Sequence, residues 1–118
     1  MSVELLTESR PKADHATVKL WLARTRELVA LAYEQPMPPS TQHVEWMDAP
    51  WQKWWVRRNY LYRGQERMVS CHFDLPQTDE GQAEAVRLFD SDEYQQSIIH
   101  AVRGWMARVD NPELFQSL

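Results

Sequence analysis

Hydrophobic and polar side chains alternate most clearly in the centre of the chain, over residues 54–75. Two runs, 54–62 and 67–75, are rich in aromatic and β-branched residues and flank a short polar segment that contains Gly64. This arrangement is typical of a β-hairpin. The pattern predicts a hairpin with Gly64 and Gln65 in a two-residue turn, where glycine adopts a positive φ without steric cost.

The predicted register sorts the hairpin into two faces, because side chains alternate across a strand. In this register Arg63 lies opposite Glu66, and Arg57 lies opposite His72. One face is apolar apart from two arginines and carries Trp54, Val56, Arg58, Tyr60, Tyr62, Arg67, Val69, Cys71, Phe73 and Leu75. The other face is mixed and carries Trp55, Arg57, Asn59, Leu61, Arg63, Glu66, Met68, Ser70, His72 and Asp74.

A helix is the alternative for the same part of the chain. The segment Asp48-Ala49-Pro50 would place a proline near the first turn, where helices accept it. Several large side chains then recur at helical spacing, namely Trp51, Trp54, Trp55, Arg58 and Tyr62. Gly64 and the β-rich residues after it fit this helix badly, so the hairpin is favoured.

Helical periodicity recurs on both sides of the hairpin. Residues 16–33 predict a helix that the prolines from Pro36 onward terminate. After Pro76, Thr78 is a predicted N-cap for a helix with Ala83, Val86 and Phe89 towards the core. Residues 91–110 predict a last long helix, ended by Asn111-Pro112, with residues 113–118 as a loosely docked tail.

Two shorter segments alternate weakly: residues 2–7 are expected as a first edge strand, and residues 42–47 as a short strand. The resulting order is strand, helix, short strand, hairpin and two helices. This order predicts an α+β fold, in which helices pack on one face of a small antiparallel sheet. A chain of 118 residues predicts a single domain, residues 1–118, with one modest core.

The βαββα order and the passage 67–76 leading into Glu84-Ala85-Val86-Arg87 resemble the small ferredoxin-like proteins of the dimeric αβ-barrel superfamily. The resemblance covers roughly the middle third of the chain. That superfamily includes cofactor-independent monooxygenases, small isomerases and metal- or ligand-binding proteins. The resemblance implies a ferredoxin-like variant whose sheet face closes a homodimer or holds a small ligand. It departs from the family at the final helix, which stands where the family usually has a fourth strand.

Composition narrows the class of protein. One cysteine permits no internal disulfide, and the chain contains neither a membrane-spanning apolar run nor a signal-peptide core, so a cytoplasmic location is expected. A net charge of −4 argues against nucleic acid as the main partner. Six tryptophans in so short a chain leave more aromatic surface than one modest core can hide.

The mixed face of the hairpin is the predicted binding surface, with Trp55, Arg57, Asn59 and His72 as its ligand- or partner-binding residues. Apolar area combined with donors and an imidazole is typical of a ligand site. Tryptophan and arginine are also enriched at protein interfaces. Either a homodimer, another protein partner or a small, aromatic or anionic ligand would fit. As an enzyme, the chain would use His72 as a general base that Arg57 keeps neutral.

Other chemistry receives less support. His43, Glu45, His72 and Asp74 could meet at a metal if their strands were neighbours, but surface roles fit them better, and no metal or cofactor is predicted. Cys71 lies on the apolar face, where a thiol is inert. Arg58, on that same face, must find a carboxylate from the acidic residues 79–93 or an aromatic ring.

These features favour a small cytoplasmic binding or regulatory protein that uses one sheet face for a partner subunit or small ligand. Two alternatives remain: a cofactor-independent enzyme, and an inhibitor or immunity-type protein that caps its partner with an acidic helical surface. No glycine-rich phosphate loop, paired CxxC or HExxH motif selects among them, and no residue is assigned to catalysis.

Overall fold

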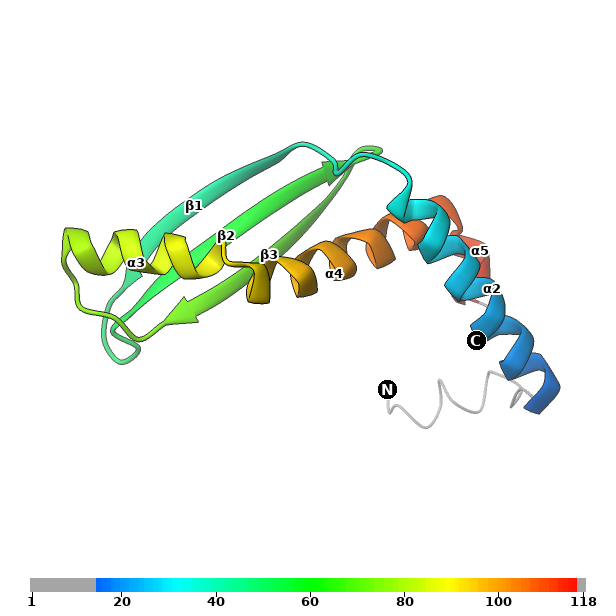
Figure 1. The fold of residues 1–118 in the computed structure, drawn as a ribbon, viewed down its shortest axis with the longest axis horizontal. Helices are drawn as coiled ribbons and strands as arrows, with labels where there is room; N and C mark the ends of the chain where they lie inside the picture. Colours follow the sequence, from blue (N-terminus) through cyan, green and yellow to red (C-terminus); the bar gives the residue numbers. More distant parts are fainter. Residues whose placement is uncertain (1–14, 117–118) are drawn as a thin grey trace, which may run out of the picture.

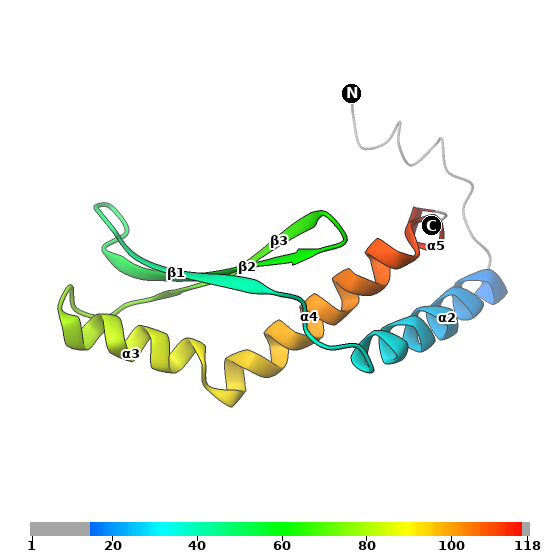
Figure 2. The same ribbon diagram turned by 90° about the horizontal axis from the view of Figure 1, so that it is seen from above.

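The computed structural model describes residues 15–116, which form an α+β fold around a three-stranded antiparallel sheet with the order β1-β2-β3. The elements are α2 (His15–Tyr33), β1 (Ser40–Met47), β2 (Lys53–Tyr62), β3 (Gln65–Phe73), α3 (Asp79–Phe89), α4 (Asp92–Asp110) and α5 (Pro112–Gln116). Helices α3 and α4 run along one face of the sheet, whereas α2 lies beyond the end of the sheet (Figures 1 and 2). The expected strand at residues 2–7 falls outside the described residues.

The hairpin of β2 and β3 is confirmed, but its turn is one residue earlier than predicted. Arg63 and Gly64 occupy the turn, both with positive φ (50° and 77°), and Tyr62 pairs with Gln65. Positive φ at both central residues is characteristic of a type I′ turn, whose twist suits the flanking strands. The predicted pairing of Arg63 with Glu66 is therefore wrong.

The earlier turn shifts the register by two residues and leaves the two faces unchanged. Tyr60 pairs with Arg67, and Trp54 pairs with Phe73, instead of with residues two positions further along. Because side chains alternate with a period of two, every residue stays on its predicted face. The alternative helix over residues 51–73 is excluded, and the short strand expected at residues 42–47 is present as β1.

The core lies between the apolar face of the sheet and helices α3 and α4. The buried side chains of the sheet are those predicted, namely Trp54, Val56, Tyr60 and Phe73. Helix α4 covers them with Ile98, Val102, Trp105, Met106 and Ala107. The predicted helix-on-sheet packing is confirmed for these elements.

Helix α3 buries Phe89, as predicted, but the rest of its buried stripe differs from the prediction. Gly81, Ala85 and Phe89 are buried, whereas Ala83 is exposed and Val86 is half-buried. Small residues at the contact let the helix axis approach the sheet closely, and such residues carry little hydrophobic signal in a sequence. The predicted N-cap is confirmed, since the Thr78 hydroxyl accepts a hydrogen bond from the backbone N–H of Gly81 at 3.0 Å.

Helix α2, predicted over residues 16–33, packs against α4 rather than on the sheet. The buried Arg103 of α4 holds its end by donating hydrogen bonds to the backbone carbonyls of Ala32, at 2.9 Å, and Gln35. A cation at the carbonyl end of a helix satisfies orphan acceptors and complements the helix dipole. The expected tail contains a short helix, α5, where the Leu114 carbonyl accepts a bond from Trp21. None of the helices within residues 15–116 is long and apolar enough to cross a bilayer.

Candidate binding surface on the open sheet face

The face of the sheet opposite α3 and α4 is covered by no helix among the described residues (Figure 2). We call it the open face. Its side chains come from alternate positions of all three strands, and the central ones are Thr41, His43, Glu45, Trp55, Arg57, Asn59, Leu61, Met68, Ser70 and His72. The four predicted binding residues Trp55, Arg57, Asn59 and His72 therefore share one surface.

Trp55 is the centre of an aromatic and cationic cluster on this face. The Arg57 guanidinium lies 4.6 Å from the centre of the Trp55 ring, within the range of a cation–π contact. On the neighbouring strand, β3 places His72 directly opposite Trp55, with the two ring centres 6.1 Å apart. The indole therefore contacts both a cation and an imidazole.

Arg57 has different neighbours from those predicted. It lies opposite Ser70 on β3 and opposite His43 on β1, not opposite His72. Its Nη1 forms an ion pair of 3.1 Å with Glu45, whose side chain is half exposed. The predicted pairing of Arg57 with His72 is therefore wrong, since Trp55 occupies the position opposite His72.

Three polar side-chain atoms along β2 are shielded from solvent and have no hydrogen-bond partner within residues 15–116. They are Trp55 Nε1, Arg57 Nε and Asn59 Oδ1, at successive open-face positions of one strand. Buried polar atoms in native proteins are nearly always paired, and an unpaired one costs about 1–3 kcal/mol. Their alignment marks the part of the open face where polar groups lack a partner among the described residues.

A shallow hollow of about 250 Å³ lies at the end of β1 and β2, and Thr41, Asn59, Leu61 and Glu66 are among its lining residues. Leu61 and Met68 are about half exposed, at 51% and 54%. Exposed large apolar side chains next to a shallow hollow are more typical of a docking surface than of an enclosed ligand site.

The sheet order separates the residues considered for a metal. His43 and Glu45 belong to β1 and His72 belongs to β3, while β2 lies between the two strands. Strands two apart are roughly 10 Å from each other, too far for side chains to share one ion without rearrangement. Within the part of the chain that the structure describes, no three His, Cys, Asp or Glu side chains are grouped to hold a metal.

Cys71 lies on the covered face of the sheet, half-buried beside the core. Burial raises the pKa of its thiol, because the thiolate is poorly solvated there. A raised pKa disfavours the reactive thiolate at neutral pH. This environment supports a packing role for Cys71.

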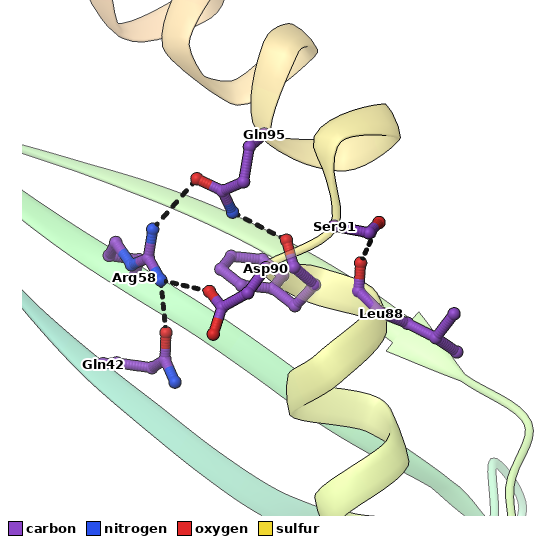
Figure 3. A network of polar contacts seen from close by, with 7 residues as sticks. Gln42, Arg58, Leu88, Asp90, Ser91 and Gln95 are labelled. Atoms are coloured by element: carbon purple, nitrogen blue, oxygen red, sulfur yellow. Dashed lines mark hydrogen bonds and ion pairs between the residues drawn. The ribbon is translucent and has the colours of Figure 1, made fainter.

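The expected partner of Arg58 is present where helices α3 and α4 meet over the sheet (Figure 3). Arg58 forms an ion pair of 2.8 Å with Asp90, and its guanidinium lies 5.0 Å from the centre of the Phe89 ring. It also donates hydrogen bonds to Gln95, at 3.2 Å, and to Gln42 on β1. Partial burial opposes ionisation, but the contacts with Tyr60 and Asp90 outweigh it and raise the pKa of Arg58 above its usual value. These contacts form a structural network that links the α3–α4 junction to the sheet.

Replacing Arg58 by methionine is expected to lower the free energy of unfolding by about 1–2 kcal/mol, after allowance for its partial exposure to water. Methionine keeps most of the side-chain length but removes the contacts to Asp90, Gln95 and Gln42. The matched control is Arg87→Met, which removes an exposed i,i+3 pair with Glu84. Urea denaturation monitored by tryptophan fluorescence measures both variants. Equal stability of the two variants would show that the Arg58 contacts add nothing to the fold.

Sequence patterns located the open face but not its internal contacts. The alternation of residues 42–47 predicts a strand in which Glu45 lies on the face opposite to Val44 and Trp46. No local pattern could tell which position of β2 faces Glu45. Comparisons with protein-family models, curated proteins and solved structures found no match to this chain.

Proposed function

We propose that this chain is a binding or regulatory protein that uses its open sheet face to hold a partner protein. The observation that carries the proposal is the row of unpaired, shielded polar atoms Trp55 Nε1, Arg57 Nε and Asn59 Oδ1 on an otherwise uncovered face. A partner that displaces the side chains covering these atoms and supplies hydrogen-bond groups there would relieve the desolvation penalty of all three. Tryptophan and arginine are also the residues that most often carry binding energy at interfaces.

The shape of the surface favours a protein over a small ligand. Binding sites for small molecules usually enclose about 300–1,000 Å³, and the hollow beside Asn59 is smaller and open. Around it, Leu61 and Met68 extend the apolar area across β2 and β3. A broad surface with a central Trp–Arg pair and exposed apolar neighbours suits a partner that presents a comparably flat face.

A ferredoxin-like relationship belongs to the same proposal. In the superfamily that the middle of the chain resembles, the corresponding sheet face closes a dimer, which agrees with the proposed use of the open face. The described residues supply three strands, so a fourth would have to come from elsewhere. The enzyme alternative, with His72 as general base, has only the neighbouring Trp55 ring as support.

The test is native mass spectrometry of the purified chain and of its complex with a partner recovered by pull-down from its source cells. Trp55→Ala and Arg57→Ala are each expected to weaken the complex at least about tenfold, as for central interface residues. Two matched controls lie away from the open face: Trp51→Ala in the β1–β2 loop and Arg26→Ala on α2, both exposed. Neither control should change the affinity.

The opposite pattern would overturn the proposal. If Trp55→Ala and Arg57→Ala bind every captured partner as tightly as the controls do, the open face is not the binding surface. A small molecule that copurifies and is lost in Trp55→Ala would instead identify the face as a ligand site. Circular dichroism of each variant separates loss of binding from loss of folding.

A further inference from the structure

Helix α2 exposes two large apolar side chains on one flank. Leu20 is 72% exposed and Leu31 is 52% exposed. Between them, at helical spacings of four, three and four residues, lie Arg24 and Glu27, which are also exposed. Residues so spaced form one stripe along a helix. We call Leu20, Arg24, Glu27 and Leu31 the α2 seam.

The seam is distinct from the face with which α2 binds its own chain. Leu28 and Ala32 are buried in the core, and Arg103 anchors the carbonyl end of the helix through Ala32. The Trp21 indole bonds the Leu114 carbonyl of α5. Helix α2 is therefore fixed by one face, and among the described residues the seam side chains stay exposed on another.

We propose that two copies of this chain pair through the α2 seam, with the helices antiparallel about a two-fold axis. In this arrangement Leu20 of each copy lies opposite Leu31 of the other, and Arg24 of each lies opposite Glu27 of the other. The seam is thus complementary to itself in both apolar contacts and charge, as a two-fold interface requires. The spacing of four, three and four residues is also that of antiparallel coiled-coil layers. Ala23 and Ala30, both small and exposed, border the seam and allow a close approach.

Within one chain, the ion pair of Arg24 and Glu27 contributes little stabilising free energy. Their ion pair of 2.9 Å is exposed, with 54% and 67% of the two side chains accessible, and such pairs contribute about 0–1 kcal/mol. In the proposed dimer the same residues form a network of four alternating charges flanked by two leucine pairs. Shielding from solvent by those leucines strengthens the attraction.

Helix α2 lies at the end of the molecule away from α3 and from most of the sheet (Figure 2).

Sedimentation velocity at micromolar concentrations tests the pairing. The wild-type chain is expected at twice its 14.0 kDa mass, and Leu20→Glu or Leu31→Glu is expected to weaken the dimer at least about tenfold. The matched control is Leu22→Glu, which places a carboxylate on a different flank of the same helix, at a residue that is 43% exposed. Leu22→Glu should leave the dimer unchanged, and circular dichroism should show all three variants folded.

Charge reversal gives a sharper test, because it predicts a pattern of rescue. Arg24→Glu alone sets carboxylates against Glu27 of the second copy, and Glu27→Arg alone sets guanidinium groups against Arg24 of the second copy. Each single variant is expected to be monomeric. An equimolar mixture of the two is expected to form a heterodimer, since each unlike pair is then restored.

Three outcomes overturn the proposal. The first is a monomeric wild-type chain at about 100 μM, well above the micromolar range where such an interface would saturate. The second is a dimer that Leu22→Glu disrupts and Leu20→Glu does not. The third is a dimer lost in Trp55→Ala but retained in Leu20→Glu, which would place self-association on the open sheet face and support the proposed function in its dimeric form. The two surfaces are thus tested independently.

Discussion

Replacing Phe89 by alanine is expected to lower the free energy of unfolding by about 3–5 kcal/mol. Phe89 is completely buried at the end of α3, where its ring packs in the core and contacts the Arg58 guanidinium. Truncation removes the apolar contacts and leaves a cavity beneath an arginine that then loses its aromatic surface. Urea denaturation at 25 °C with tryptophan fluorescence gives the change directly.

Two comparisons make the Phe89 result interpretable. Phe89→Leu retains most of the buried volume and should cost clearly less than Phe89→Ala. Phe73→Ala, at a buried β3 position whose ring meets Tyr94 edge-on, should cost about 3–5 kcal/mol by the same mechanism. A loss below about 1 kcal/mol for Phe89→Ala would contradict the packing of α3 on the sheet, since a fully buried phenylalanine cannot be removed so cheaply.

The second large effect is expected at Gly81, in the first turn of α3. A Cβ atom added there would lie 1.9 Å from the carbonyl oxygen of Pro76 and 3.2 Å from Trp54 Nε1. Those two groups are themselves joined, since the Trp54 indole donates a hydrogen bond of 2.7 Å to that carbonyl. Gly81→Ala must therefore displace the start of α3 from the sheet. We expect a loss of about 3 kcal/mol, the upper end of the range for overpacking.

Gly104 provides the matched control for Gly81. It also lies inside a helix, α4, but a Cβ added there meets no atom within 4 Å. Alanine favours a helix over glycine by about 1 kcal/mol, so Gly104→Ala should leave stability unchanged or raise it by up to that amount. The thermal midpoint should therefore fall in Gly81→Ala and stay the same or rise in Gly104→Ala. A Gly81→Ala protein as stable as the wild type would show that α3 does not approach Pro76 this closely.

The two proposed surfaces lie on different parts of the molecule and need not compete. The open face belongs to the sheet, whereas the α2 seam lies on a helix that contacts α4 instead. Self-association through α2 would leave both open faces of a dimer accessible. Such a dimer would present two open faces at once. Two linked binding sites raise the apparent affinity for a partner that is itself multivalent.

Much of the sheet and its faces followed from the sequence alone, because period-two alternation is a local property. The division of β2 and β3 into a covered and an open face survived a register error of two residues, since such a shift preserves parity. The Thr78 cap, the helical spans and the need of Arg58 for a partner are likewise set by neighbouring residues or by the burial of a charge. Trp55, Arg57, Asn59 and His72 were therefore grouped correctly on one face.

The features that only the tertiary structure decided depend on contacts between distant segments of the chain. In the turn, Arg63 forms an ion pair of 2.7 Å with Asp110 at the end of α4, a residue far from it in the sequence. The close packing of Gly81 and Ala85 depends on the sheet beneath them, because small side chains carry almost no hydrophobic signal. Strand order put β2 between His43 and His72 and so removed the metal hypothesis. The placement of α2 on α4 decided which leucines of that helix face outward, because helical periodicity marks an apolar flank without showing what packs against it.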